Sequence, residues 1–358
     1  MEARMSEFAI GVVGAGTVGT AHAEAIETER PALDVIAVAD TDPDAGRTFA
    51  DRFGATRYED YERLFEEAAA DAVLVAIPNN CHADCMVAAL ERDRHVLCEK
   101  PLATTVDEAE RIKSVARESD GTAMVGHPMV FKPTVASTKR RIEAGEFGRL
   151  YDVDLRYVRR RGIPQLGSWF TRSTTAGGGA LVDCGIHLLS VAMDVLGDPD
   201  IRTVSATTTA AFGTKDDYTY RTMWGGDPLD DPEFSVEDSV RALIRTVDGT
   251  TISLDCAWAS NRPTATAMQF LGTDTGVEID VHTEAATLYG TEYDQLTETA
   301  IEPADVDLFA EEWAYFADVM REERAHTRNT LDHAVNLQRL LAAIYESAAR
   351  GEEVSVEP

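Results

Sequence analysis

Asp183 and His187 are the first residues of this chain whose types and spacing suggest chemistry. They lie in the stretch LVDCGIHLLSVAMDVLG, residues 181 to 197, which is otherwise mostly apolar. Because the two positions are four apart, a helix places their side chains on one face, one turn from each other. An imidazole, with a reference pKa near ~6.5, suits general-base work close to neutral pH. The stretch therefore predicts a helix that carries an acid–base pair, with a hydrogen-bonded core histidine as the alternative.

Lys100 is a second candidate, in the segment LCEKP. Lysine occurs at only five positions, and every other basic residue is arginine. Glu99 and Lys100 come at the carboxyl end of a predicted strand, where open α/β sheets bind their ligands. A lysine kept there suggests a role that arginine does not fill, such as reversible proton donation. The alternative is a surface lysine that follows a strand.

A glycine motif near the start of the chain predicts dinucleotide binding. Gly14, Gly16 and Gly19 have the spacing G-x-G-x-x-G, and the motif follows the β-branched run of a buried strand. Such glycines permit a tight turn, close approach of a pyrophosphate and close packing of the next helix. The intervening Thr17 and Val18 join them as expected cofactor-binding residues.

Asp40 ends the next predicted strand and bears on the choice of nucleotide. A carboxylate there accepts hydrogen bonds from an adenine ribose and repels a 2′-phosphate. We therefore expect NAD as cofactor, with NADP possible because high salt weakens that repulsion.

The first 126 residues read as a doubly wound parallel sheet. Strand-like and helix-like segments alternate five times, with helices expected over residues 20–28, 42–54 (Gly54 as the stop), 82–93 and 105–119. Thr105 and Glu108 have the spacing of a capping box. This alternation predicts a Rossmann-type α/β domain over residues 6–126.

The rest of the chain, residues 127–358, predicts an α+β domain with a mostly antiparallel sheet. Strand-like runs between 201 and 288 carry hairpin turns at Asp248-Gly249 and Thr275-Gly276. Residues 213–238 form a long excursion, and its part from 218 to 238 resembles a lid in composition. Helical patterns at 305–322 and 331–349 end the chain and are expected to pack back on the first domain.

Composition and charge exclude several classes of protein. The 63 Asp and Glu against 33 Lys and Arg give a formal net charge of −30, which repels nucleic acid and anionic membranes. No apolar run is long enough to span a bilayer, and the N-terminus lacks the apolar segment of a secretory signal, so we expect a cytoplasmic protein. An acidic, lysine-poor surface is typical of salt-loving organisms, although an acidic mesophile protein is the alternative.

The cysteines predict buried free thiols. They are odd in number and mostly have apolar neighbours. Cys81, His82 and Cys85 have a spacing that suggests a metal, but nothing nearby completes a four-ligand set. We therefore expect no metal site.

Over essentially its whole length the chain resembles the glucose–fructose oxidoreductase, inositol dehydrogenase and rhizopine-catabolism (Gfo/Idh/MocA) family of NAD(P)-dependent oxidoreductases. The glycine motif, IPNNCHAD, CEKPLATTVDEAE and GGGALVDCGIHLLSVAMDVLG follow one another in the family's order and spacing. The resemblance implies that Lys100, Asp183 and His187 act on the substrate. It also implies a homodimer or homotetramer built on the open face of the second domain's sheet.

Further site residues follow from the resemblance and from position. Pro78, Asn79 and Glu99 match family positions near the cofactor, and His82 begins the next helix beside them. Candidate substrate contacts outside the catalytic residues are His127, Arg160 and Trp169. Trp169 offers a stacking surface for a sugar ring, although a large aromatic residue is as often packing. On a strand, either Arg160 alone or its two arginine neighbours point inward.

The expected activity is hydride transfer between NAD and a secondary alcohol of a cyclic polyol, a sugar or a sugar derivative. One alternative within the family is a glycoside hydrolase that uses transient oxidation without net redox change. A second is a nucleotide or sugar sensor without catalysis, against which the intact Lys100, Asp183 and His187 argue.

Overall fold

The computed structural model describes residues 7–29, 33–223, 225–230 and 232–356. The chain forms two compact units, the first of residues 1–128 and 306–335 and the second of residues 129–305 and 336–358. The division at residues 126 and 127 expected from the sequence lies close to this boundary. The segment Val306–Val335, however, belongs to the first unit.

The first unit holds a six-stranded parallel sheet in the order β3-β2-β1-β4-β5-β6. The strand order reverses between β1 and β4, because β2 and β3 follow on one side of β1 and β4, β5 and β6 on the other. Open α/β sheets bind their ligands at such a point. The strands are β1 (Phe8–Val13), β2 (Leu33–Ala39), β3 (Thr56–Tyr58), β4 (Ala72–Val75), β5 (His95–Glu99) and β6 (Ala123–Gly126). The helices are α1 (Thr17–Glu29), α2 (Pro43–Phe53), α3 (Tyr61–Glu67), α4 (His82–Leu90) and α5 (Val106–Ala116), with the 3₁₀ turn η1 (Asn79–Cys81) before α4.

Local sequence explains several helix ends in this unit. Asp42 caps α2 by accepting from the N–H groups of Asp44 and Ala45, and Gly54 ends it in a left-handed conformation. The capping box of Thr105 and Glu108 is present at the start of α5. Two expectations need correction: α1 begins at Thr17 instead of residue 20, and β3 with α3 adds a strand and a helix between α2 and β4.

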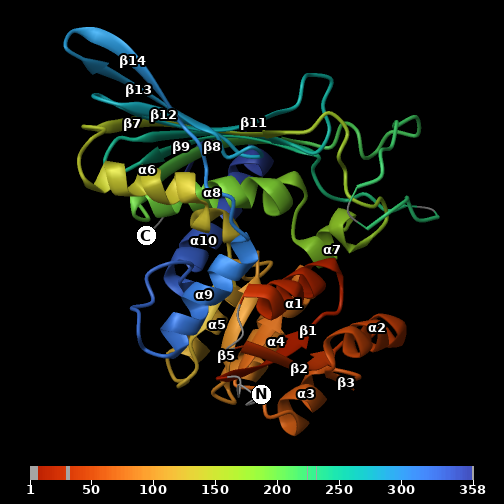
Figure 1. Ribbon diagram of the computed structural model, residues 1–358. Helices are drawn as coiled ribbons and strands as arrows, with labels where there is room; N and C mark the ends of the chain where they lie inside the picture. Colours follow the sequence, from red (N-terminus) through yellow and green to blue (C-terminus); the bar gives the residue numbers. More distant parts are fainter. Residues whose placement is uncertain (1–6, 30–32, 224, 231, 357–358) are drawn as a thin grey trace. The chain divides into compact units, whose positions relative to one another are not determined.

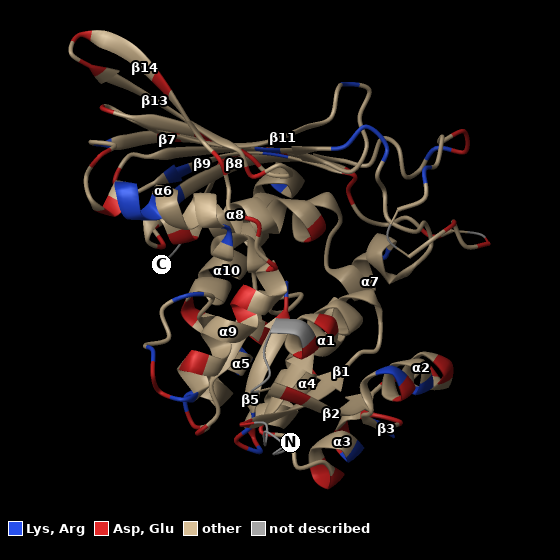
Figure 2. Cartoon of the chain, in the orientation of Figure 1, with Lys and Arg blue, Asp and Glu red and all other residues tan. Residues whose placement is uncertain are grey.

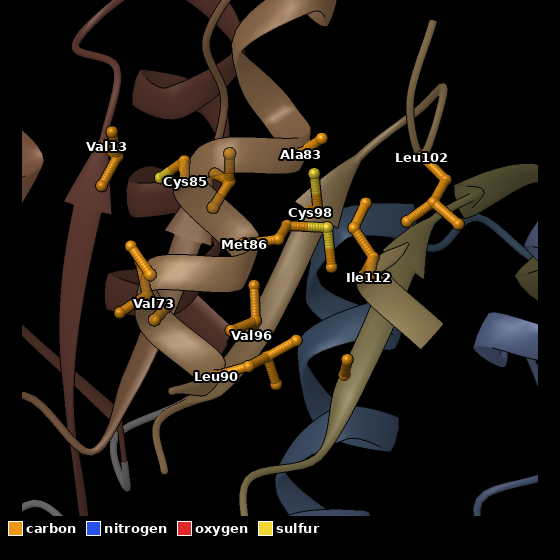
Figure 3. Packing of buried hydrophobic residues seen from close by; sticks show 14 of the residues in the cluster. Val13, Val73, Ala83, Cys85, Met86, Leu90, Val96, Cys98, Leu102 and Ile112 are labelled. Atoms are coloured by element: carbon orange, nitrogen blue, oxygen red, sulfur yellow. The ribbon is translucent and has the colours of Figure 1, made fainter. Parts of the chain in front are cut away.

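A hydrophobic core lies between the parallel sheet and helices α4 and α5. Figure 3 shows Met86 and Leu90 of α4 turned toward Val96 and Cys98 of β5, all fully buried. Such burial contributes about 1.5–3 kcal/mol for each large apolar side chain.

Two helices follow in the C-terminal part of the chain, as expected. α9 (Leu308–Met320) packs against α1 in the first unit (Figure 1). α10 (Leu331–Arg350) begins in the first unit and continues in the second.

The second unit is built on a nine-stranded sheet in the order β14-β13-β12-β11-β7-β10-β9-β8-β15. All its pairs are antiparallel except that of β7 with β10. The hairpin of β13 and β14 lies beyond the strands expected from the sequence. The strands are β7 (Leu150–Val158), β8 (Ile201–Thr209), β9 (Ser239–Thr246), β10 (Thr251–Ala257), β11 (Ala265–Gly272), β12 (Gly276–Asp280), β13 (Ala286–Glu292), β14 (Gln295–Ile301) and β15 (Val354–Ser355).

Helices cover one face of this sheet. α6 (Pro133–Glu143) and α8 (Ile186–Leu196) lie along it, and α8 packs against β7 (Figure 1). Among the described residues the central strands of the opposite face carry no helix, and a hollow of about 680 Å³ lies there over β7, β8, β9 and β10. The short helix α7 (Ser173–Ala176) and the π-helical turn η4 (Leu181–Gly185) precede α8.

One helical stretch of the described residues, Ser173–Leu196, has the length and hydropathy of a membrane span. Its most apolar window is 83% buried inside the protein. That burial is typical of a core helix.

Candidate active site

The glycine motif forms an open cradle between β1 and α1. Gly14 has φ 104°, and a Cβ there would lie 2.2 Å from the carbonyl oxygen of Ala76. A Cβ on Gly19 would lie 2.0 Å from the carbonyl oxygen of Gly14, whereas one on Gly16 would meet nothing within 4 Å. Because α1 starts at Thr17, its first N–H groups open onto the free space above Gly16. The cradle therefore fits the pyrophosphate of a dinucleotide.

Asp40 is held firmly at the end of β2. Its Oδ2 accepts from the N–H of Ala15 and its Oδ1 from the N–H of Asp42, each at 2.7 Å. These bonds join the carboxylate to the glycine loop and leave further lone pairs for ribose hydroxyls. The side chain is half-buried, so it remains within reach of a ligand.

His82 links the loops that follow β4 and β5. Its Nδ1 lies 2.7 Å from the carbonyl oxygen of Pro101 and its Nε2 2.8 Å from that of Ile77. Burial lowers the pKa of this fully buried imidazole. These contacts indicate that His82 holds the two loops together. Its direct contact with the cofactor stays a prediction. Pro78 and Asn79 lie in the segment that joins β4 to α4, and Asn79 is 6% exposed.

Glu99 is fixed beside Lys100 by a hydrogen-bonded chain that starts in the C-terminal helices. Trp313 donates its indole N–H to Nδ1 of His22 across 3.0 Å, so the second ring nitrogen of His22 carries the proton. That nitrogen, Nε2, lies 2.9 Å from Oε1 of Glu99, and the Lys100 N–H donates to Oε2 at 3.2 Å. Sequence reasoning did not connect His22 with this site, because His22 lies 77 residues from Glu99.

Asp183 and His187 are the two partly exposed residues of the stretch from 180 to 193. Every other residue from 180 to 193 is buried. The expected α-helix is interrupted: residues Leu181–Gly185 form a π-helical turn, and α8 starts at Ile186. Turns of this kind are frequent at functional sites. The two polar residues are therefore partly accessible and not enclosed in the core.

The Asp183 carboxylate has several polar neighbours within the second unit. Trp258 donates its indole N–H to Oδ2 across 2.8 Å, and Sγ of Cys184 lies 3.2 Å from the same oxygen. Nη1 of Arg159 is 4.0 Å away, and Arg159 also donates to the hydroxyl of Tyr157 at 3.2 Å. These contacts stabilise Asp183 as a carboxylate. Sequence reasoning missed Trp258, which lies 75 residues from Asp183.

The remaining substrate candidates lie in different surroundings. Arg160 is exposed just beyond β7, and it is Arg159 that lies beside Asp183. Trp169 is half-buried and stacks on Phe170, with ring centroids 3.8 Å apart. His127 is 1% exposed and meets the ring of His333 edge to face. Their contact with a substrate stays a prediction, and the burial of His127 favours packing.

The cysteines are free thiols, and four of them are buried. Burial raises the pKa of Cys85, Cys98 and Cys256. Within the described part of the chain, no cluster of three or more His, Cys, Asp and Glu side chains is arranged to hold a metal ion.

Comparison with known proteins agrees with this geometry. The model of the oxidoreductase family with an NAD-binding Rossmann fold matches residues 8–127, and that of the Gfo/Idh/MocA C-terminal domain matches residues 135–278. A D-glucoside 3-dehydrogenase of Escherichia coli (strain K12) is 30% identical over 257 residues, 72% of this chain and 72% of that protein.

Two further similarities extend over nearly the whole chain. A D-xylose 1-dehydrogenase (NADP(+)) of Haloferax volcanii is 27% identical over 361 residues, which cover 97% of this chain and 99% of that protein. The solved structure of levoglucosan dehydrogenase in complex with NADH and levoglucosan has a TM-score of 0.85 at 22% identity and covers 98% of this chain and 100% of its own, which shows the shared fold. The first unit is thus an NAD-binding Rossmann domain, and the chain belongs to the Gfo/Idh/MocA family of oxidoreductases.

Proposed function

We propose that this protein oxidises a secondary ring hydroxyl of a sugar to a ketone, with Lys100, Asp183 and His187 as its catalytic residues. The observation that carries the proposal is the partial exposure of Asp183 and His187 within the otherwise buried stretch of residues 180–193. A carboxylate and an imidazole that are accessible together within an apolar stretch are typical of a site that binds a ligand or transfers a proton.

The chemistry assigns a role to each residue. NAD, when bound, supplies the acceptor for the hydride that leaves the carbinol carbon. The hydroxyl proton passes through the Lys100 amine, which contacts the reacting oxygen, to His187, the general base that keeps it. Asp183, kept ionised by Trp258 and Arg159, accepts a hydrogen bond from a neighbouring sugar hydroxyl.

For the substrate we propose a pyranoside oxidised at position 3. The name of the D-glucoside 3-dehydrogenase supports this position, and the solved complex with levoglucosan supports a sugar ring. The test is NADH fluorescence with purified protein in KCl and a panel of D-glucosides, levoglucosan, inositols and D-xylose, each with NAD and with NADP. A methyl glucoside with deuterium at C3 identifies the carbon, because the deuterium then appears on the reduced nucleotide.

The outcomes separate the candidate reactions. NADH formation with a glucoside and deuterium transfer from C3 supports the proposal. Transfer from another carbon overturns the assigned position, and release of free sugar from a glycoside without NADH identifies a redox-neutral hydrolase. Tight NAD binding with neither reaction across the panel favours a sensor.

We also propose a homo-oligomer that forms through the open face of the nine-stranded sheet. The hollow over β7, β8, β9 and β10 supports this surface, because its lining is partly apolar and partly charged, as at Arg156, Arg241 and Asp255. Light scattering of the purified chain measures the mass. A monomer at all protein concentrations would overturn this part.

A further inference from the structure

A buried carboxylate, that of Glu237, binds the start of the helix that carries Asp183 and His187. Its Oε2 accepts from the N–H of Gly179 at 3.0 Å, and its Oε1 accepts from the N–H of Leu181 at 2.9 Å. The main-chain oxygen of Glu237 accepts from the N–H of Ala180 at 3.1 Å. One residue therefore satisfies three consecutive N–H groups that a helix start leaves without partners.

No side chain from the helix start itself caps these N–H groups. Ala180, which precedes the π-helical turn, makes no capping hydrogen bond with its side chain. Glu237 is 58 residues from Gly179 in the sequence and is 8% exposed. The hydroxyl of Tyr345, on α10, adds a fourth bond by donating to Oε1 at 3.1 Å. Burial raises the pKa of Tyr345 well above its ordinary value, so the phenol keeps the proton that it donates.

The glycines before the helix are explained by this arrangement. A Cβ on Gly178 would lie 1.9 Å from the hydroxyl of Tyr345, and one on Gly179 would lie 1.9 Å from the main-chain oxygen of Glu237. Any larger residue at either position would push the helix away from Glu237. The glycine run therefore permits the close approach of Glu237 and Tyr345.

A second connection leads from the same place to Asp183. The next residue, Asp238, accepts from the N–H of Trp258 with its main-chain oxygen at 2.8 Å. Trp258 in turn donates its indole N–H to Asp183. Residues 237 and 238 thus fix both the start of the helix and a hydrogen-bond donor to its carboxylate.

Glu237 and Asp238 are the last two residues of the excursion between β8 and β9. Of the excursion's residues 213–238, Trp224 and Asp231 lie outside the described part. Asp238 closes its base by accepting from the N–H groups of Phe212 and Gly213, at 2.5 and 3.0 Å. Two further main-chain bonds join the excursion to the segment that precedes the helix of Asp183 and His187. The N–H of Leu229 donates to the carbonyl oxygen of Leu166 at 2.9 Å, and the N–H of Ser235 donates to that of Thr171 at 2.9 Å.

We infer that Glu237 is a positioning residue: its carboxylate holds the start of the helix in place and thereby sets the orientation of Asp183 and His187 toward the substrate. The inference rests on the proposed function for the catalytic role of these two residues. It assigns the last residues of the excursion, Glu237 and Asp238, a role as the support of the helix.

The test compares Glu237→Gln with Tyr345→Phe and a control. A glutamine keeps one acceptor oxygen and turns an NH₂ group toward one of the backbone donors, so Glu237→Gln breaks the cap at nearly constant volume. Tyr345→Phe leaves the carboxylate and its bonds to Gly179 and Leu181 intact. Asp248→Asn is the control, because it makes the same change at a turn of the same unit, where Asp248 accepts from the N–H of Thr250 at 3.2 Å.

We expect Glu237→Gln to lower kcat by about tenfold to a hundredfold, since small displacements of catalytic groups have effects of this size. The KM and Kd for NAD should stay within twofold of the parent values, because the glycine motif lies in the first unit. Tyr345→Phe should lower kcat less than Glu237→Gln, and Asp248→Asn should leave it unchanged. All values are taken per folded molecule, from the unfolding curve of each variant.

Hydrogen exchange supplies a readout that needs no substrate. In Glu237→Gln the amides of Gly179, Ala180 and Leu181 should exchange faster than in the parent, whereas those of β9 should not. Unchanged exchange at these amides, or a kcat per folded molecule equal to that of the parent, overturns the inference. Failure of the proposed function looks different: His187→Ala would then retain activity, or the parent would oxidise no sugar, while the exchange result still stands.

Discussion

Trp258 donates its indole N–H to Oδ2 of Asp183 across 2.8 Å. The indole is fully buried in the second unit, whereas Asp183 keeps partial exposure. A hydrogen bond to an ionised group is worth about 1.5–3 kcal/mol, and its loss falls on the charged form. The bond therefore both orients the carboxylate and favours its ionised state.

Trp258→Phe removes this donor at modest change in volume. We expect kcat/KM for the sugar to fall by about tenfold to a hundredfold, which corresponds to that hydrogen-bond energy. Steady-state kinetics in the parent and in an Asp183→Asn background make a double-mutant cycle. Equal losses in both backgrounds would show that Trp258 acts by packing and not through Asp183.

Lys100 and His187 are expected to carry the proton transfer. Lys100→Met and His187→Ala should each lower kcat by about 10²- to 10⁴-fold, the usual contribution of general acid–base catalysis. Lys100→Arg keeps the charge but cannot release its proton, so it should be nearly as inactive as Lys100→Met. Fluorescence titration should show NAD binding close to that of the parent. Near-normal turnover in both Lys100→Met and His187→Ala would refute these roles.

Asp40 is expected to set the preference for NAD. Asp40→Ser removes the charge that repels a 2′-phosphate, so the ratio of kcat/KM for NADP to that for NAD should rise at least about tenfold, or ~1.4 kcal/mol. The neighbouring Asp42→Ala is the control, since Asp42 caps α2. It should lower the free energy of unfolding by about 1 kcal/mol and leave the cofactor ratio unchanged. An unchanged ratio in Asp40→Ser would assign the preference to other residues.

The chemistry-bearing segments were readable from the sequence because their signals are local. The glycine turn, the cap by Thr105 and Glu108 and the burial around Asp183 and His187 each depend on residues within one or two turns of the chain. The three residues of β3, in contrast, carry no apolar run, and nothing in the composition of Leu181–Gly185 marks a π-helical turn. Local sequence patterns therefore identified the catalytic candidates, but they did not predict the π-helical turn that carries Asp183.

The supporting residues were not readable because they come from far along the chain. His22 lies 77 residues from Glu99 and 291 from Trp313. Trp258 and Glu237 contact the helix that carries Asp183 and His187 from other parts of the chain. Only the fold brings such pairs together. The glycine run at 177–179 was a visible signal, but its cause, the close approach of Tyr345 and Glu237, required the structure.

Glu312 gives the free energy of unfolding a dependence on pH. This fully buried residue of α9 accepts from Nδ2 of Asn329 at 3.2 Å. Burial, with the nearby charge of Glu99, raises its pKa well above the ordinary value. The folded chain thus holds the proton more tightly than the unfolded chain. Its contribution to stability is fully present below the unfolded pKa, near ~4.3, and is lost as the pH rises through the folded pKa.

Glu312→Gln keeps the oxygen that faces Asn329 and removes the ionisation. Urea unfolding should show the variant close to the parent at about pH 4, and more stable than the parent by a margin that grows as the pH rises. Glu311→Gln, at the exposed neighbouring position of α9, controls for the loss of one negative charge. A margin that shrinks with rising pH would contradict the raised pKa.

The net charge of −30 predicts that salt stabilises the folded chain. Figure 2 shows acidic residues on helices and loops of both units, so the repulsion is spread over the surface. The Debye length falls from about 10 Å at 0.1 M salt to about 3 Å at 1 M, which screens repulsion between neighbouring acidic groups. Lysines offset little of this repulsion, because they are few and because Lys113, Lys139 and Lys215 already pair with carboxylates.

We therefore expect the Tm to rise steadily with KCl up to molar concentrations, and more than in sucrose of equal osmolality. Sucrose strengthens burial by exclusion from the surface but screens no charge, so the difference between the two solutes isolates the electrostatic part. Equal rises in Tm would assign the effect to exclusion alone. A fall in Tm with KCl would mean that the surface ion pairs, which salt weakens, outweigh the repulsion among the acidic residues.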